Sequence, residues 1–191
     1  PFGHSWLGWS AYVRAIGRQI LATCPRWLIV AQGVGGADYW WGENIAKHVN
    51  QTIELPLPNR LVLSPHSYGH GVGKSYMSDA AFPANLPGVW QSKWGFVAEA
   101  TGTPIILGEW GGIWSNGPDE VGGASTGTAA WQRQMAKYLA ERGFGSFYWT
   151  LNDNSFRTGS LFTDAHRAEK LALLRTLPVT IIAQVQSEWV A

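Results

Sequence analysis

Glu109 stands at the carboxyl end of the apolar segment "PIILGEWGG" (104–112), which has the composition of a buried strand. A carboxylate beside a buried strand loses much of its hydration, so it needs either a bonding partner or a chemical role. Because side chains alternate along a strand, we expect Ile105, Leu107 and Glu109 to point to the same side. Two interpretations stay open: a structural carboxylate bonded to an Arg or a backbone amide, and a functional one.

His66 and Tyr68 end the preceding apolar segment, "RLVLSPHSY" (60–68). Being two positions apart on an extended chain, they share a face, and both can reach a carboxylate at the neighbouring strand end. There they could hold that carboxylate ionised or pass it a proton. A hydrogen-bonded core histidine and an ordinary sheet tyrosine are the alternative interpretation.

Tryptophan is abundant, with 12 residues, and several of them stand at or just after the ends of apolar segments. Their flat apolar faces suit the C–H faces of sugar rings, and a nearby asparagine suits the hydroxyl groups. The candidate sugar contacts are Trp40, Trp41, Trp110, Trp149 and Asn152. Trp90, Trp94 and Trp131 lie inside helical patterns, and we expect them in the core.

Apolar segments alternate with amphipathic ones along the chain. The predicted strands cover residues 27–34, 60–68, 104–112 and 145–152. Their starts are 33, 44 and 41 residues apart, which allows a crossover helix each time and is too wide for hairpins. The predicted helices cover residues 10–24, 88–102, 125–143 and 165–177. This order predicts an α/β fold with a parallel sheet and right-handed crossovers.

Two parallel folds fit this order, a doubly wound sheet and a closed βα barrel. No Gly-x-Gly-x-x-Gly follows a predicted strand, so a dinucleotide site has no support. In a barrel, the chemistry gathers at the carboxyl ends of the strands, where this chain has its polar and aromatic residues. A whole barrel has eight strands and about 250 residues. Four strands in 191 residues therefore predict half a barrel.

Composition excludes several classes of function. A net charge of +1, from 14 basic and 13 acidic residues, offers no basic surface for nucleic acid or an anionic membrane. No apolar run reaches the roughly 18 residues of a membrane span. The five histidines lack metal-binding spacing, and the single Cys24 cannot build a thiolate site. We therefore expect no metal and no cofactor.

Together these motifs resemble those of a known family. The segments "LVLSPHSY", "PIILGEWGG" and "YWTLNDNSFRTGSL" look like strands six, seven and eight of a family 5 glycoside hydrolase of the cellulase type. The segments "RWLIVAQGV" and "YWWGENI" resemble strand five and its loop. The resemblance implies the C-terminal half, strands five to eight, of a TIM (β/α)8 barrel. It implies a partial catalytic domain over residues 1–177, with 178–191 as an unassigned tail.

The resemblance also implies an activity. A member of this family would be secreted and would hydrolyse β-1,4-glucan or a related β-glycan with retention of configuration. Glu109 would be the nucleophile, with His66 and Tyr68 as its hydrogen-bonding neighbours.

Substrate contacts are implied as well. Trp149 would be the platform under the sugar that is cleaved, and Trp40 or Trp41 would be a wall of a neighbouring subsite. One departure concerns Gln32, where family members often carry Glu; we expect it to have a modest local effect.

Retaining chemistry requires a second carboxylic acid about 5 Å from the nucleophile. In the family this acid is the Glu of an Asn-Glu-Pro motif after strand four, and Pro1 resembles the Pro of that motif. We therefore expect the acid/base just before Pro1, the N-terminal half of the barrel as a partner, and little glucan turnover by this chain alone. Were the chain active by itself, Asp38 or Glu43 would be the candidate acids.

Two alternatives remain. One is a non-catalytic carbohydrate-binding barrel fragment. The other is a doubly wound α/β protein in which Glu109 is structural, and convergence of Glu109, His66 and Tyr68 would count against it.

Overall fold

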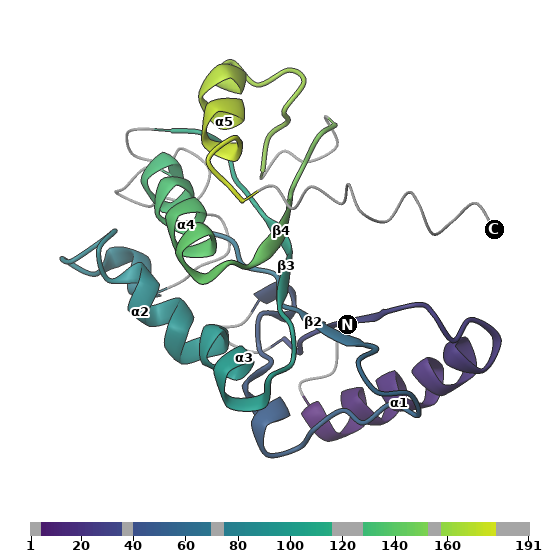
Figure 1. Cartoon of the computed structure of the whole chain (residues 1–191). Coiled ribbons are helices and arrows are strands. Elements are labelled where there is room, and N and C mark those ends of the chain that lie inside the picture. Colours follow the sequence, from purple (N-terminus) through teal and green to yellow (C-terminus); the bar gives the residue numbers. More distant parts are fainter. Residues whose placement is uncertain (1–4, 36–39, 70–74, 116–127, 153–157, 179–191) are drawn as a thin grey trace.

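A computed structural model of the chain describes residues 5–35, 40–69, 75–115, 128–152 and 158–178 (Figure 1). The strands are β1 (Ile29–Gln32), β2 (Leu61–Ser64), β3 (Ile106–Trp110) and β4 (Gly145–Tyr148). The α-helices are α1 (Trp6–Thr23), α2 (Leu86–Trp90), α3 (Phe96–Thr101), α4 (Thr128–Arg142) and α5 (Arg167–Leu174). Each predicted strand and helix has a counterpart, although the strands are shorter than the apolar segments and the helix predicted over 88–102 is interrupted. Most of the unassigned tail lies outside the described residues.

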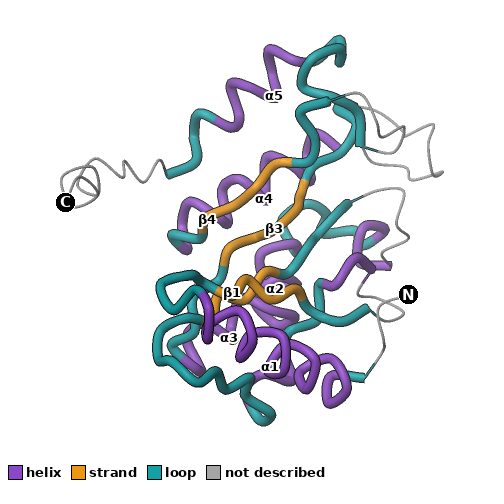
Figure 2. The backbone as a smooth tube through the Cα atoms, turned by 90° about the vertical axis from the view of Figure 1, so that its right-hand side faces the viewer, coloured by secondary structure: helices purple, strands orange, loops and turns teal. Residues whose placement is uncertain are grey.

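The four strands run parallel, as predicted. β1 pairs with β2 from Ile29 opposite Leu61 onward, and β3 pairs with β4. Isolated parallel bridges, Leu63 to Ile105 and His66 to Glu109, join β2 to β3. The strands therefore follow one another in space in chain order, and α1 lies at the β1 end (Figure 2).

Helix α1 is fixed to β1 by its buried face. Ser5 caps the helix by accepting a hydrogen bond from the Gly8 N–H at 3.4 Å. The buried residues recur at helical spacing and are Trp6, Ser10, Val13, Gly17 and Leu21. The indole N–H of Trp9 donates to the Gln32 carbonyl at 2.7 Å, which holds α1 against the carboxyl end of β1.

The predicted helix over 88–102 is not continuous. A π-helical turn (Gln91–Gly95) separates α2 from α3. Tyr138 of α4 packs so closely on Gly95 that any Cβ there would collide with the tyrosine hydroxyl, which donates to Gln91 Oε1 at 2.8 Å. The wider turn, which local sequence periodicity does not reveal, thus accompanies a tight helix–helix contact.

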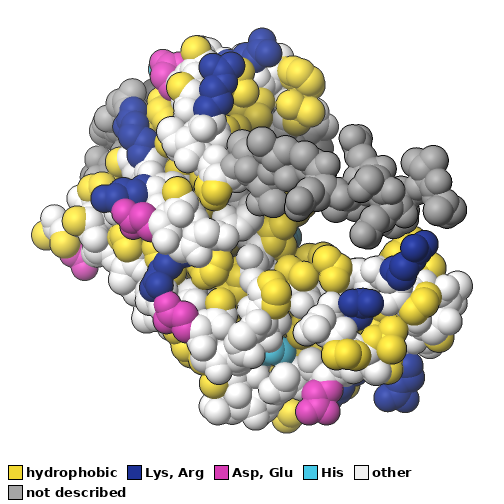
Figure 3. Space-filling model, in the orientation of Figure 1, with side chains coloured by type: hydrophobic (Ala, Val, Ile, Leu, Met, Phe, Trp, Pro, Cys, Tyr) yellow, Lys and Arg dark blue, Asp and Glu magenta, His cyan; other side chains and the backbone are white. Residues whose placement is uncertain are grey.

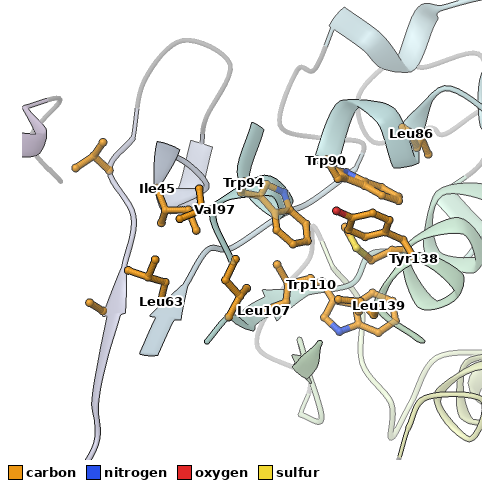
Figure 4. Packing of buried hydrophobic residues seen from close by; sticks show 14 of the residues in the cluster. Ile45, Leu63, Leu86, Trp90, Trp94, Val97, Leu107, Trp110, Tyr138 and Leu139 are labelled. Carbon is orange, nitrogen blue, oxygen red and sulfur yellow. The ribbon is translucent and has the colours of Figure 1, made fainter. Parts of the chain in front are cut away.

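An aromatic core fills the space between the strands and the helices α2, α3 and α4, which lie on one side of them (Figures 1 and 4). Trp90, Trp94 and Trp131 are fully buried, so the prediction that they belong to the core is confirmed. Trp90 meets Trp131 edge to face at 5.6 Å between ring centroids, and Trp94 meets Tyr138 in the same way at 5.5 Å. Such contacts add to the large apolar area that these rings bury.

The side of the sheet next to α1 carries an open apolar groove. It has a volume of about 360 Å³ and is lined by residues that include Tyr12, Ile16, Trp27, Leu28 and Val30. Leu28 and Val30 are each 56% exposed although they belong to or flank a strand. Figure 3 shows hydrophobic side chains gathered over α1. Exposed apolar surface beside a sheet edge is a common site of interaction with other polypeptide or with a ligand.

The buried indoles lead to a prediction about stability. Trp90→Ala should lower the free energy of unfolding by about 3–5 kcal/mol, because it leaves a cavity among packed rings. Trp27→Ala, at a site that is 62% exposed, is the matched control and should cost less than about 1 kcal/mol. Urea unfolding followed by fluorescence measures both. Equal losses of unfolding free energy in the two variants would show that the aromatic cluster does not stabilise the core.

Candidate active site

Glu109 lies at the carboxyl end of β3, on the opposite side of the strand from Leu107. The pairing of β3 with β4 shifts register between Leu107 and Trp110, and both of these residues are fully buried in the core (Figure 4). Glu109 instead lies beside His66 and Tyr68. The prediction that Leu107 and Glu109 share a face is therefore wrong, because an irregularity in the strand breaks the period of two.

Gly108 lets the ends of β2 and β3 approach one another. A Cβ at this position would lie 2.6 Å from His66 Nε2, which is inside van der Waals contact. The Gly108 N–H donates to the Pro65 carbonyl at 2.9 Å, and the Ser67 N–H donates to the Glu109 carbonyl at 3.0 Å. These bonds continue the parallel pairing beyond β2 and set His66 beside Glu109.

Two side chains of the segment after β2 converge on one carboxylate oxygen. The Tyr68 hydroxyl donates to Glu109 Oε2 at 2.7 Å, and His66 Nδ1 lies 3.4 Å from the same oxygen. The side chains of His66 and Glu109 are 16% and 24% exposed, so the cluster is sheltered but open to a ligand. This convergence counts against the doubly wound interpretation, in which Glu109 is only structural.

The surroundings of Glu109 favour its ionised form. Burial raises the pKa of the carboxyl, but hydrogen bonds from His66 and Tyr68, with the charge that His66 can carry, outweigh it. The net effect is a pKa below the usual range for Glu. The site therefore holds a carboxylate anion at neutral pH.

Tyr68 is a permanent donor to this anion. Burial raises its pKa above the ordinary tyrosine value, and the hydrogen bond to Glu109 and the charge of that carboxylate raise it further. A phenol in such a site keeps its proton throughout the physiological pH range, so Tyr68 always presents an O–H to Glu109.

Gln32, at the end of β1, belongs to the same cluster. Its Nε2 donates to the Trp41 carbonyl at 2.5 Å and lies 3.3 Å from His66 Nδ1. Sequence reasoning noted this residue but did not place it in the site. The available signal was its position, since the carboxyl ends of neighbouring parallel strands meet at one edge of the sheet.

The predicted sugar contacts differ in their surroundings. Trp41, in a 3-10 turn (Trp40–Gly42), is 45% exposed, and the side chain of Trp40 lies outside what the structure describes. Trp149 follows β4, donates its backbone N–H to the Trp110 carbonyl at 2.8 Å, and is 37% exposed. Asn152 is exposed and accepts a hydrogen bond from the Thr150 hydroxyl.

Trp110 does not lie in the site. Its side chain is fully buried and packs edge to face on Tyr148 at 5.0 Å. The structure contradicts its predicted role as a sugar contact, because neighbouring residues of a strand point to opposite sides and this indole faces the core while Glu109 faces the site.

Glu43 is unsuited to the role of an acid. It is fully buried and accepts a hydrogen bond from the Ser67 hydroxyl at 2.6 Å. Since the backbone of Ser67 also donates to the Glu109 carbonyl, Glu43 helps to hold the segment that carries His66 and Tyr68. Asp38, the other candidate acid, lies outside the described residues.

Within the described ranges, no three His, Cys, Asp or Glu side chains gather where they could hold a metal ion. A search of the same part of the chain for a helix long and apolar enough to cross a membrane finds none.

Comparison with known proteins supplies the context for this cluster. Residues 1–155 match the cellulase family, glycosyl hydrolase family 5. The chain is 35% identical over 169 residues to an endoglucanase of Paenibacillus polymyxa, a match that covers 85% of this chain and 41% of the relative. It is 34% identical over 188 residues to the major extracellular endoglucanase of Xanthomonas campestris, covering 92% and 37%.

Solved structures agree with these relatives. The catalytic domain of the Xanthomonas campestris endoglucanase superposes with a TM-score of 0.76 at 32% identity, over 88% of this chain and 49% of that one. An endocellulase of Pyrococcus horikoshii, solved with cellotetraose, gives a TM-score of 0.75 at 30% identity, over 89% and 48%. The chain thus spans about half the length of these solved structures. It spans less than half the length of the curated relatives. The parallel βα order, the Glu109 cluster and the match over residues 1–155 lead to one conclusion: this chain belongs to family 5 of the glycosyl hydrolases, the cellulase family, whose endoglucanases are TIM barrels.

Proposed function

We propose that the chain forms part of the catalytic domain of an endoglucanase that hydrolyses β-1,4-glucan with retention of configuration. The observation that carries the proposal is the Glu109 carboxylate, bonded by Tyr68 and flanked by His66 at the ends of parallel strands. The relatives are named endoglucanases, and one neighbour was solved with cellotetraose, which supports a β-glucan substrate. The extracellular relative supports secretion.

In this chemistry Glu109 is the nucleophile. Its carboxylate attacks the anomeric carbon and displaces the leaving glucan, whose oxygen takes a proton from the second carboxylic acid. The resulting glycosyl-enzyme is then cleaved by water, which gives a proton back to that acid and releases Glu109. Among the described residues, Tyr68 and His66 both approach Oε2, which leaves Oε1 as the oxygen positioned to attack. The lowered pKa of Glu109 keeps this oxygen anionic at neutral pH.

The exposed indoles provide the sugar contacts. Trp149 follows the strand next to Glu109, and its accessible face suits stacking under the sugar that is cleaved. Trp41, reached from β1, is the wall of a neighbouring subsite, with Trp40 beside it in the chain. Asn152 adds polar contacts to the sugar hydroxyls.

The second carboxylic acid comes from outside these 191 residues. Of the two candidate acids within the chain, Glu43 is buried against Ser67 and Asp38 lies outside the described residues. We assign β1 to β4 to strands five to eight of the barrel and the acid/base to strand four. The preceding strands would cover the apolar groove between α1 and β1, which supports the N-terminal half of the barrel as a partner.

Complementation tests this assignment. The chain alone should hydrolyse soluble cellulose poorly, because it lacks the acid. Adding the separately expressed N-terminal half of the Xanthomonas campestris catalytic domain should produce hydrolysis that neither half shows alone. Glu109→Gln should reduce the restored rate more than about a hundredfold, as measured by release of reducing sugar.

The control is Glu141→Gln, on the exposed face of α4, which should leave the restored rate unchanged. Efficient hydrolysis by the isolated chain, lost on Glu109→Gln, would contradict the assignment and place an acid within the 191 residues.

The pH dependence tests the role of Tyr68. Removing its hydroxyl deprives the Glu109 anion of a donor, so Tyr68→Phe should raise the pKa of Glu109. Activity depends on the ionised Glu109 carboxylate and is lost as pH falls through its pKa. The acid limb of the pH–activity profile of the complemented enzyme should therefore move to higher pH. Glu141→Gln, on the exposed face of α4 and away from the groove, is again the control. An acid limb that stays in place in Tyr68→Phe would rule out this role.

A further inference from the structure

Gln32 is clamped in a defined orientation. Its Nε2 donates to the Trp41 carbonyl, and turning the amide over would set Oε1 against that same oxygen. Gly42, in the left-handed region at φ +80°, packs directly on the side chain, since a Cβ there would lie 2.6 Å from Gln32 Cγ. The backbone of Gly33 also donates to the Gly42 carbonyl at 3.1 Å, which ties this loop to the end of β1.

The fixed amide creates a competition at His66. Nδ1 of this imidazole lies 3.3 Å from the Gln32 amide nitrogen, a donor, and 3.4 Å from Glu109 Oε2, an acceptor. A neutral imidazole carries one proton, on either nitrogen. A proton on Nδ1 is donated to Glu109 and leaves the Gln32 N–H facing another donor. With the proton on Nε2, Nδ1 accepts from Gln32, and Tyr68 is the remaining donor to Glu109.

We propose that Gln32 is a positioning residue, which competes with Glu109 for Nδ1 of His66 and so limits the support that His66 gives to the nucleophile. The inference rests on the proposed function only for the role of Glu109. The ionisable groups around His66 are Glu109 from β3 and Tyr68 from its own segment, with Glu43 bonded to the hydroxyl of Ser67 between them.

The competition links the position of the His66 proton to the loop that carries Trp41. Because the Trp41 carbonyl orients the Gln32 amide, the loop that carries the exposed Trp41 indole sets the hydrogen bond at His66. A shift of that carbonyl would release the amide and let His66 donate fully to Glu109. Gln32 therefore connects the wall of one subsite to the nucleophile through the Trp41 carbonyl and His66.

Two substitutions at Gln32 separate the effects of the amide donor and of charge. Gln32→Met keeps the length of the side chain and removes the competing N–H. Gln32→Glu replaces the donor by a charged acceptor. Gln51→Met, at a half-buried glutamine outside the cluster, is the matched control. Long-range proton–nitrogen NMR of the labelled 191-residue chain reports the tautomer of His66, and carboxyl carbon shifts report the titration of Glu109.

In the unsubstituted chain we expect the Nε2–H tautomer of His66 to be populated. Gln32→Met should move the proton toward Nδ1 and shift the Glu109 titration midpoint to lower pH, because His66 then donates to it. Gln32→Glu should also move the proton toward Nδ1 but shift the midpoint to higher pH, because a second carboxylate takes that proton and adds negative charge.

Opposite midpoint shifts in the two variants are the signature of the proposal, since loosened packing would move both in one direction. An unchanged tautomer in Gln32→Met, or midpoint shifts of the same sign, would overturn it. These spectra require no turnover. If the midpoint shifts are opposite but the chain fails to complement, the inference is supported and the proposed function is contradicted. If the chain complements but the midpoint shifts are not opposite, the proposed function is supported and the inference is overturned.

Discussion

The contact on which the site depends is the close approach of two parallel strand ends at Gly108. A side chain there would occupy the space of His66, so only glycine lets the Pro65 carbonyl and the Ser67 amide bond to β3. These backbone bonds place Tyr68 and His66 against one oxygen of Glu109. The Glu109 carboxylate is consequently held at the end of a strand, and the pairing of β3 with the segment after β2 sets its position. Burial alone would raise its pKa; the interactions with its neighbours His66 and Tyr68 outweigh that effect and keep it anionic.

The two sides of the sheet differ in how far their apolar residues are covered. On the side of α2, α3 and α4, interlocking indole and phenol rings fill the core and anchor β3 and β4. On the side of α1, leucine, valine and tryptophan side chains of the β1 region face an open groove. Parallel strands that carry apolar residues on both faces are normally buried on both faces. The chain spans about half the length of its solved relatives, and in the proposed function the N-terminal half of the barrel covers this face and brings the acid/base with it.

Local pattern was sufficient for the element order, the parallel sheet and the convergence of Glu109, His66 and Tyr68, because apolar runs and their polar ends report strands and strand ends directly. The register shift in β3 was not predictable, since it arises from pairing with β4 and separates Leu107 from Glu109, which were expected on one face. Trp110 was predicted as a sugar contact from its place at a strand end, but it follows Glu109 directly, points to the other side of the strand and is a core residue. The place of Gln32 in the cluster depends on the Trp41 carbonyl, a tertiary contact that residue spacing does not encode.

Covalent trapping tests most directly whether Glu109 is the nucleophile. A 2-deoxy-2-fluoro-β-cellobioside with a dinitrophenolate leaving group needs no acid to depart, so it reports on the nucleophile alone, in the isolated chain or in the complemented barrel. Peptide mapping by mass spectrometry should find the fluorosugar on the peptide that contains Glu109, and Glu109→Gln should abolish the adduct. An adduct on a different carboxylate, or labelling that persists in Glu109→Gln, would contradict the account.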